Sequence, residues 1–307
     1  MAQDPGACMI ERPIVFVMGA GASSCYEFPL GKNLCRMVIE ELKPNVVSHT
    51  QIIENTVFES GYVDRFQSAL EFSGQNSVDA FLESRQEFLA IGKSAMATIL
   101  IRYEKPSILW RFSDNNWMRY LYDKMRASTL EKFVENKISF ITFNFDRSLE
   151  HFLFTSLQNT FGGSTEACAD VMNKIPLLHL HGRLGFLPWQ DANARPYGTE
   201  LSIRALEMCV ENIKLVHEEL EADRTKVFEQ AKTLMQHAEK IYFLGFGFGA
   251  LNMERLGLID LPANKAIATA DGFTQTEVNN ISNKLGGRIS IYPNYNVDSL
   301  FRNMVSW

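Results

Sequence analysis

Six short apolar runs, rich in β-branched and aromatic residues, constrain the fold of this chain more than any other feature. Segments with helical periodicity separate most of them, such as the one that carries Leu34, Val38 and Leu42, and the long stretch from Ile203 to Lys240. Buried strands that alternate with helices are typical of a parallel sheet covered on both faces. The sequence therefore predicts an α/β fold with a doubly wound parallel sheet of about six strands. The predicted strands are Ile14 to Met18, Ile138 to Thr142, Leu177 to Leu180, Ile241 to Gly245, Lys265 to Thr269 and Ile289 to Tyr292.

A gap of about 120 residues separates the first predicted strand from the second, and its pattern is helical. Asn76 or Ser77 is a candidate N-cap for a helix whose apolar positions start at Val78, and NNWMRYLYDKM predicts a further amphipathic helix. We therefore expect residues 48–137 to form a helical module. It is inserted into an α/β domain made from residues 1–47 and 138–307.

The composition excludes several classes of protein. The chain has 307 residues, of which 46% are hydrophobic and 21% charged, as in globular proteins. Its 36 acidic residues outnumber the 30 basic ones, and no run of Lys or Arg occurs, which argues against direct binding of nucleic acid. No stretch approaches the ~20 apolar residues that span a bilayer, and the N-terminus lacks an export signal. The five cysteines form no Cys-x-x-Cys pair, so we expect a cytoplasmic protein without a structural zinc site.

Glycines and isolated polar residues follow five of the predicted strands. The five segments read GAGASS, TFNFD, HLHGRLG, GFGFGALN and TADGF. In an open α/β sheet, ligands bind beyond the carboxyl ends of the strands, where the connections diverge to opposite faces. One such segment could be a structural turn, but five at one edge of the sheet predict a binding site.

Gly19 and Gly21, after the first strand, predict a close approach of the backbone to an anion, helped by the positive end of the following helix. The loop departs from the full dinucleotide-binding fingerprint, because Ser24 stands where the third glycine would be. It also lacks the lysine of a P-loop. On its own the loop fits either a phosphate cradle or a tight structural turn.

Asn144 and Asp146 interrupt an aromatic, apolar context immediately after the second strand. Asp146 fits the N-cap of a helix that begins near Arg147. Asn144 is two residues too early for that role, so we expect its carboxamide to orient a ligand or a water molecule.

His179 and His181 have the same parity and would face the same side if the third strand continued. Gly182 leaves room beside the ring of His181, and a histidine at the mouth of a sheet can titrate near neutral pH. We interpret His181 as the chemical residue and His179 as its structural neighbour. A metal site is disfavoured, because no carboxylate stands at ligand spacing beside them.

In their order and spacing, these motifs resemble those of sirtuin-like NAD-consuming proteins. The inserted module also resembles the bacterial branch of that family, and the similarity extends from about residue 13 to the C-terminus. The motifs of the α/β domain are Gly19-Ala-Gly-Ala-Ser23 with Pro29 downstream, Thr142-x-Asn144-x-Asp146, His181-Gly182, and Gly245-x-Gly247-x-Gly249 with Asn252. Those of the module are Ser77-Val-Asp79, Phe81-Leu82 and Gly92-Lys93-x-Ala95.

The resemblance implies a Rossmann-type fold that binds NAD as its substrate. It implies that Asn144 and His181 are the catalytic pair, and that Asp146 holds the carboxamide of nicotinamide. Contacts to the phosphates from the first glycine loop, and to the adenosine ribose from Asp271, are implied as well. The full implied set of NAD-binding residues is Gly19, Ala20, Gly21, Ala22, Ser23, Thr142, Gly245, Gly247, Phe248, Asn252 and Asp271.

Two departures from the protein deacylases of this family indicate a hydrolase. The cysteine pairs of their zinc module are absent, and FPLGKNL stands where they carry an arginine soon after the proline. Both departures are typical of bacterial sirtuin-like NADases, which deplete NAD in antiphage defence. We therefore expect an NAD glycohydrolase that releases nicotinamide and ADP-ribose. The alternatives are a deacylase or ADP-ribosyltransferase, and a non-catalytic sensor of NAD or ADP-ribose.

Control of such an enzyme is expected to come from assembly or from a partner protein of a defence system, because the predicted elements leave no separate regulatory domain. Bacterial sirtuin-like NADases often form oligomers, so the resemblance implies a homo-oligomer. The helical module is the expected contact surface or lid, since its apolar positions, including Trp110 and Trp117, exceed what one face against the sheet needs. A two-layer core inside the chain would account for them equally well.

Overall fold

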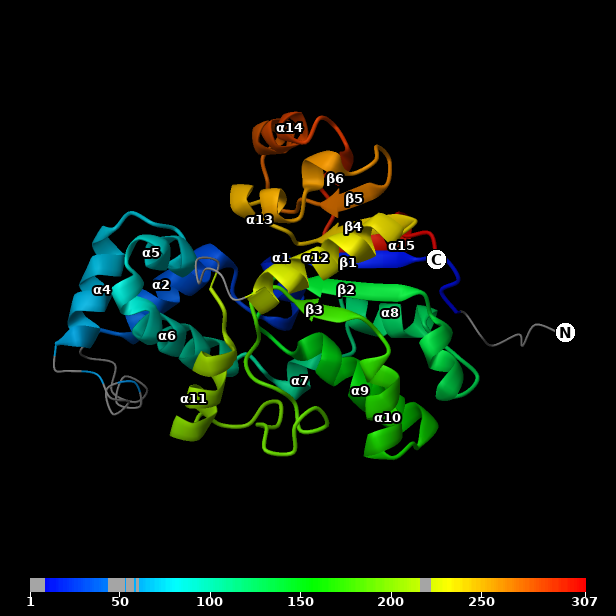
Figure 1. The fold of residues 1–307 in the computed structure, drawn as a ribbon, viewed down its shortest axis with the longest axis horizontal. Coiled ribbons are helices and arrows are strands. Elements are labelled where there is room, and N and C mark those ends of the chain that lie inside the picture. The colour runs from blue at the N-terminus through cyan, green and yellow to red at the C-terminus, as the bar shows by residue number, and fades with distance from the viewer. Residues whose placement is uncertain (1–8, 44–52, 54–57, 59–60, 216–221) are drawn as a thin grey trace, which may run out of the picture.

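The computed structural model describes residues 9–43, 53, 58, 61–215 and 222–307 (Figure 1). Its centre is one six-stranded sheet in which every strand pair is parallel, with the order β3-β2-β1-β4-β5-β6. This is the strand order of Rossmann-like doubly wound folds, so the predicted fold class is confirmed. The strands are β1 Ile14–Met18, β2 Ile138–Thr142, β3 Leu177–His179, β4 Lys240–Leu244, β5 Ala266–Thr269 and β6 Ile289–Tyr292.

The register of the three central strands brings their carboxyl ends level with one another. Met18, the last residue of β1, pairs with Thr142 of β2 on one side and with Leu244 of β4 on the other. The loops after these three strands therefore leave the sheet at the same edge. In an open parallel sheet this edge is where ligands bind.

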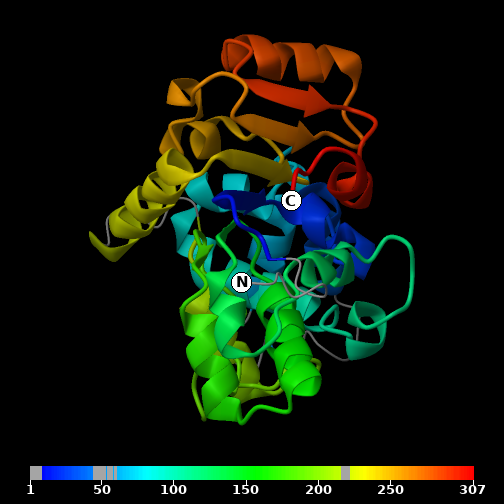
Figure 2. The same cartoon turned by 90° about the vertical axis from the view of Figure 1, so that its right-hand side faces the viewer.

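Helices cover both faces of the sheet, because side chains of a strand point alternately to opposite faces. Phe16 of β1 packs in the first core with helices α2, α9 and α15 and the inserted helices. Val15 and Val17 pack in the second core with α12, α13 and the segment around α14. Figure 2, turned by 90°, shows α14 at the β6 edge of the molecule and α9 and α10 toward the opposite edge.

The helices of the described chain include several of a single turn. The longer ones are α2 Gly31–Glu41, α4 Tyr62–Phe72, α5 Val78–Ser84, α6 Leu89–Ile101, α8 Trp117–Lys124, α9 Ser148–Phe161, α10 Thr165–Asn173, α11 Ile203–Asn212, α12 Ala222–His237, α14 Gln275–Lys284 and α15 Val297–Asn303. The shorter ones are α1 Ala20–Ser23, α7 Pro106–Leu109, α13 Ala250–Arg255 and the 3₁₀ turns Ser24–Tyr26, Gln86–Phe88, Glu131–Glu135 and Leu258–Asp260.

The segment between β1 and β2 is helical, as the sequence predicts, and α4, α5 and α6 gather beside α2 at one end of the sheet (Figure 1). Ser77 is the N-cap of α5 and accepts a hydrogen bond from the Ala80 amide. The module is not a separate layer, because α6 is buried along its length and packs against both α2 and α11. The predicted boundary at residue 48 lies outside the described residues.

The two tryptophans of the module pack inside the chain. The Trp117 indole nitrogen donates to the Ala22 carbonyl at 2.8 Å, and its ring stacks on Phe301 of α15. Trp110 stacks on Phe152 of α9 with ring centroids 4.6 Å apart. These two side chains therefore belong to a layered core within the chain.

The prediction of one long helical stretch from Ile203 to Lys240 is wrong. Helix α11 ends at Asn212, and Ile213 pairs with Gly182 in an isolated antiparallel bridge. Helix α12 begins at Ala222, beyond residues 216–221, which are outside the described part. In the described part of the chain, no helix has the length and apolar character needed to cross a membrane.

Candidate functional site

The site is built around the point where the loops after β1 and β4 meet. These adjacent strands lie at the centre of the sheet, where the connections diverge to opposite sides. A Cβ atom on Gly19 would lie 2.6 Å from the carbonyl oxygen of Gly245, closer than side-chain atoms come to backbone. The glycines of both loops are therefore required for the two backbones to pack against each other.

The amides of the first glycine loop are engaged inside the protein. The Gly19 amide donates to the Leu244 carbonyl and the Gly21 amide to the Gly245 carbonyl, each at 3.0 Å. The predicted close approach of the backbone thus has a partner in the chain itself, and these two amides are directed toward β4. Ala20, between them, lines two separate cavities, one on each side of the loop.

A cavity of about 530 Å³ opens at the carboxyl edge of the sheet. It is in the size range of small-molecule sites. Four predicted elements contribute to its walls: the first glycine loop, the TFNFD segment, His181, and the loop after β4. Further wall residues come from the start of α2 and from the inserted module, which sequence reasoning did not assign to the site: Phe28, Pro29, Gly31, Lys32, Leu34, Asn76, Ser77, Val78, Asp79, Met96 and Leu100.

Asn144 is held rigidly at this cavity. Its backbone amide donates to the Thr142 hydroxyl at 3.0 Å. Its side-chain nitrogen donates to the Gly19 carbonyl and to the Ser23 hydroxyl, each at 3.0 Å. The carboxamide is thus less free than predicted, and Oδ1 is the atom left for a ligand, since no donor to it is found among the described residues.

Asp146 lines the cavity and also accepts two hydrogen bonds from the protein. Its Oδ1 accepts from the amide of Ser148, the first residue of α9, at 3.1 Å. The N-cap of α9 is Arg147, so the helix begins one residue later than predicted and the assignment of Asp146 as its N-cap is wrong. Its Oδ2 accepts from the Ser23 hydroxyl at 2.7 Å. Burial raises the pKa of Asp146, and the hydrogen bonds from Ser148 and Ser23 act in the opposite direction. Ser23 therefore joins Asn144 to Asp146 across the cavity wall.

His181 reaches the cavity from the turn after β3. Its ring lies edge-on to Phe143, with centroids 5.2 Å apart, and beside Phe228 of α12. Gly182 follows with a φ of +71°, and a Cβ there would lie 1.9 Å from the Asn212 carbonyl oxygen. Glycine is thus required at this position by the bridge to Ile213, and that turn aims His181 at the cavity.

His179 lies on the other face of the sheet from His181, because the strand does not continue to His181. β3 ends at His179, and the chain turns before the alternation can continue to His181. The His179 ring contacts Glu150 of α9, whereas His181 contacts Phe228 of α12. His179 is thus a buried neighbour of the Asn144 segment rather than a second group in the cavity.

A second cavity, of about 470 Å³, lies on the other side of the first glycine loop. It shares Ala20, Gly31, Phe246 and Gly247 with the first cavity. Asp271, after β5, lines it, together with two groups that the sequence did not single out, Thr269 and Asp298. The Oδ1 atom of Asp298 is buried and has no hydrogen-bond partner among the described residues.

The remaining predicted residues fall into two groups. Asn252 and Gly247 line the first cavity, and Gly21, Gly245 and Gly247 line the second. Ala22, Thr142 and Phe248 line neither cavity and serve the structure. The ring of Phe248 packs on Phe243 and Phe246 in the second core.

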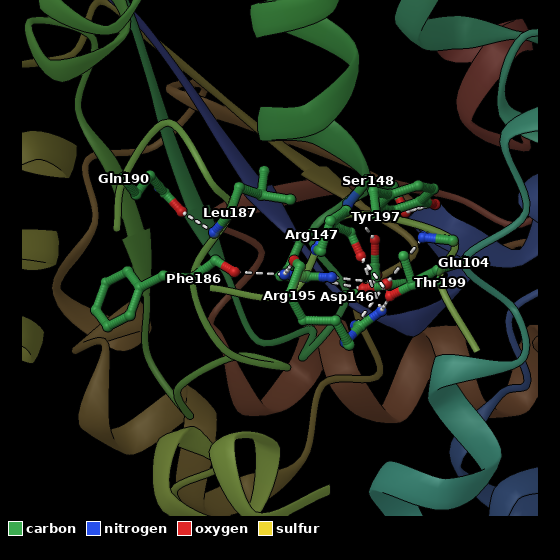
Figure 3. A network of polar contacts seen from close by, with 12 residues as sticks. Glu104, Asp146, Arg147, Ser148, Phe186, Leu187, Gln190, Arg195, Tyr197 and Thr199 are labelled. Atoms are coloured by element: carbon green, nitrogen blue, oxygen red, sulfur yellow. Dashed lines mark hydrogen bonds and ion pairs between the residues drawn. The ribbon is translucent and has the colours of Figure 1, made fainter. Parts of the chain in front are cut away.

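A buried ionic cluster that was not predicted from the sequence lies next to Asp146 (Figure 3). Arg147 donates to both oxygens of Glu104, at 2.8 and 2.7 Å, and both side chains are fully buried. Arg195 is 2.6 Å from the same carboxylate. The cluster links Glu104, in the turn after α6 of the inserted module, to the residue directly after Asp146. A signal for it was the charged pair Asp146-Arg147 inside an otherwise apolar segment.

Within the described ranges, no group of three or more His, Cys, Asp or Glu side chains is placed to hold a metal ion. The sequence matches no model of a known protein family and no curated protein.

Proposed function

We propose that the protein hydrolyses NAD at the bond between nicotinamide and ribose, giving nicotinamide and ADP-ribose. The observation that supports this most is the convergence of Asn144, Asp146 and His181 on one cavity that adjoins a second one. Two cavities separated by a glycine loop suit the two nucleosides of a dinucleotide. The first would take nicotinamide and its ribose, and the second, with Asp271, the adenosine.

The two phosphates would lie at the wall that both cavities share. Gly31 lies on this wall and is the first residue of α2, which has eleven residues. The free backbone amides at the start of this helix therefore point toward the wall. Lys32 lines the first cavity beside it. Because the Gly19 and Gly21 amides are engaged with β4, we assign the anion contacts to Ala20, the start of α2 and Lys32.

The chemistry suits these side chains. Nicotinamide leaves as a neutral molecule from an already cationic ring, so no acid is needed, and the site must stabilise a ribosyl cation and present water to it. In our proposal Asn144 Oδ1 orients the ribose or the water, and Asp146 holds the carboxamide of nicotinamide. As the water oxygen bonds to the ribose carbon, His181 accepts the water proton. A positioned acid or base contributes about 10²- to 10⁴-fold in rate.

We also propose a role for the protein in antiphage defence. A cytoplasmic enzyme that destroys NAD would need restraint, which we assign to assembly with itself or with a partner of an antiphage defence system. Activity assays should therefore include the assembled or triggered form.

The test is to incubate the protein with NAD and to measure nicotinamide and ADP-ribose. Asn144→Ala and His181→Ala should abolish turnover, whereas Asn159→Ala and His237→Ala, at exposed positions on α9 and α12, should not. Release of nicotinamide only with an acetylated peptide would favour the deacylase. Transfer of ADP-ribose to protein would favour the transferase, and binding of NAD without turnover would favour a sensor.

A further inference from the structure

The buried pair His179 and Glu150 lies directly behind Asn144. Nε2 of His179 is 2.9 Å from Oε1 of Glu150, and Nδ1 is 3.1 Å from the backbone carbonyl oxygen of Asn144. The two side chains are 4% and 3% exposed. Both ring nitrogens of one histidine therefore face oxygen atoms, away from solvent.

This geometry limits the protonation states in which both contacts can be hydrogen bonds. A backbone carbonyl can only accept a hydrogen bond, and so can an ionised carboxylate. A neutral imidazole carries one N–H, so it can satisfy only one of the two contacts and turns a lone pair toward the other oxygen. Both contacts are hydrogen bonds only when the ring and the carboxyl group share two protons, as imidazolium with carboxylate or as imidazole with carboxylic acid.

The surroundings favour the ionic form. Although burial acts to raise it, the pKa of Glu150 is lowered, because His179 and Arg183 stabilise its carboxylate. The other charged or titratable groups around Glu150 are Asp146, from the loop after β2, and Arg147 and His151 on α9. Removal of either charge from such a buried pair leaves the other charge uncompensated, which is strongly destabilising.

The contact from His179 to Asn144 connects the pair to the cavity, because Asn144 lines it. The amide and the side chain of Asn144 are fixed by Thr142, Gly19 and Ser23, and its carbonyl is the atom that His179 holds. The orientation of this carbonyl sets the peptide that leads through Phe145 to Asp146. The relative placement of Asn144 and Asp146 at the cavity thus depends on a hydrogen bond from His179.

We propose that His179 and Glu150 form a positioning pair that holds Asn144 and Asp146 in place only while the pair carries two protons. This rests on the proposed function, since it takes Asn144 and Asp146 as the groups that meet NAD. It assigns His179 a role beyond that of a structural neighbour, and it makes catalysis depend on a proton that never contacts the substrate.

Two substitutions of His179 test its contact to Asn144 separately from its contact to Glu150. The side-chain nitrogen of Asn occupies a place close to Nδ1, so His179→Asn keeps a donor to the Asn144 carbonyl, whereas His179→Gln reaches toward Glu150 and loses that donor. Both leave a buried cavity and should lower the melting temperature. We expect kcat of His179→Gln to fall about 10- to 100-fold below that of His179→Asn, as for a small misplacement of reacting groups.

Glu150→Gln tests the proton itself. A glutamine amide can donate to Nε2 of a neutral ring, which leaves Nδ1–H for Asn144, so both contacts survive without the extra proton. The wild-type rate should fall at alkaline pH as the pair loses a proton, and Glu150→Gln should lack this fall. Glu166→Gln, at an exposed glutamate of α10, is the matched control and should keep the wild-type profile.

The protonation state also has a readout that does not need activity. In ¹⁵N-histidine spectra, the signal of His179 is the one that disappears in His179→Asn. At neutral pH this signal should be that of an imidazolium in the wild type and that of a neutral ring in Glu150→Gln. A neutral His179 ring beside an ionised Glu150 carboxylate in the wild type, the latter read from the ¹³C signal of the Glu150 carboxyl group, would overturn the pair. Equal kcat for His179→Gln and His179→Asn would overturn it as well. A wild type that never releases nicotinamide would refute the proposed function. The spectra would still show whether the His179–Glu150 pair carries two protons.

Discussion

The backbones of Gly21 and Gly245 are in direct contact, although 224 positions of sequence separate them. A Cβ atom on Gly21 would lie 2.6 Å from Cα of Gly245, and one on Gly245 would lie 2.2 Å from the carbonyl carbon of Gly21. Gly245 also has a φ of +57°, a conformation that glycine adopts without strain. The contact between the loops after β1 and β4 therefore leaves no room for a side chain at Gly21 or Gly245.

Gly21→Ala and Gly245→Ala should both destabilise the protein. Overpacking typically costs about 1–3 kcal/mol, and Gly245→Ala should cost more, because its backbone is left-handed as well. Urea unfolding of the variants measures this. Gly31→Ala, where an added Cβ would meet no atom within 4 Å, is the control and should unfold at the wild-type midpoint. Wild-type stability of Gly21→Ala would contradict the close contact.

Glu104→Gln should cost far more stability than a matched change at the surface. The Glu104 carboxylate is fully buried between Arg147 and Arg195, so neutralising it leaves cationic groups without their counter-charge (Figure 3). Breaking such a buried pair typically costs about 3–5 kcal/mol. Glu27→Gln breaks an exposed pair with Lys105 and should cost at most about 1 kcal/mol. Equal midpoints of denaturation for the two variants would refute a structural role for the cluster.

The order of the elements was predictable because the chemistry of each is local. The run from Ile14 to Met18 is apolar without interruption, as strands buried on both faces are, and β1 is buried throughout. The break after Asn212 was not predictable, because the bridge from Ile213 to Gly182 is a long-range contact. The opposite facing of His179 and His181 was not predictable either, because parity decides the facing only while a strand continues, and β3 ends at His179.

The site was predictable where it depends on strand ends, and Asn144, Asp146 and His181 do line one cavity. Contributions from elsewhere in the chain were not. Lys32 and the start of α5 reach the cavity only because α2 and the inserted module fold over it. The partners of Asn144 also needed the structure, since the sequence does not reveal that Ser23 joins it to Asp146.

His151 should make the protein less stable in weak acid. Burial lowers the pKa of His151 from 6.5 to about 4, and its ring stacks on Tyr197 with centroids 4.3 Å apart. Between these two pH values the unfolded chain binds a proton that the folded protein does not, so stability falls as the pH is lowered through this window. The melting temperature of His151→Phe, which keeps a stacked ring, should fall less from about pH 7 to about pH 4.5 than that of the wild type. The exposed His237→Gln should follow the wild-type slope; a parallel slope for His151→Phe would contradict the assignment.

The second cavity should distinguish NAD from NADP if the proposed function holds. Asp271 and Asp298 line it, Asp298 in an ion pair with Arg302, and among the described residues no lysine or arginine is in its lining. The 2′-phosphate of NADP would meet like charge there, which costs several kcal/mol, so we expect kcat/KM to favour NAD by at least ~10²-fold. Asp271→Asn and Asp298→Asn should narrow this ratio, whereas Asp260→Asn, at an exposed site outside both cavities, should not. Equal use of both nucleotides by the wild type would remove the adenosine assignment.

Ser23→Ala should shift the pH dependence of turnover toward neutral pH. The Ser23 hydroxyl donates to Asp146 and accepts from Asn144, so it stabilises the ionised carboxylate that the proposed reaction uses. Its hydrogen bond lowers the pKa of Asp146 against the raising effect of burial, and removal of the hydroxyl should raise that pKa further. Protonation of Asp146 would then inactivate the enzyme at a higher pH than in the wild type, and kcat at neutral pH should fall by about tenfold or more, as when one positioned group is disturbed. The measurement is the acid limb of the pH–rate profile. Ser94→Ala, which removes a buried hydroxyl that donates to a helix carbonyl in α6, is the control and should leave the limb in place. An unshifted acid limb in Ser23→Ala would show that Asp146 does not act as the ionised carboxylate in turnover.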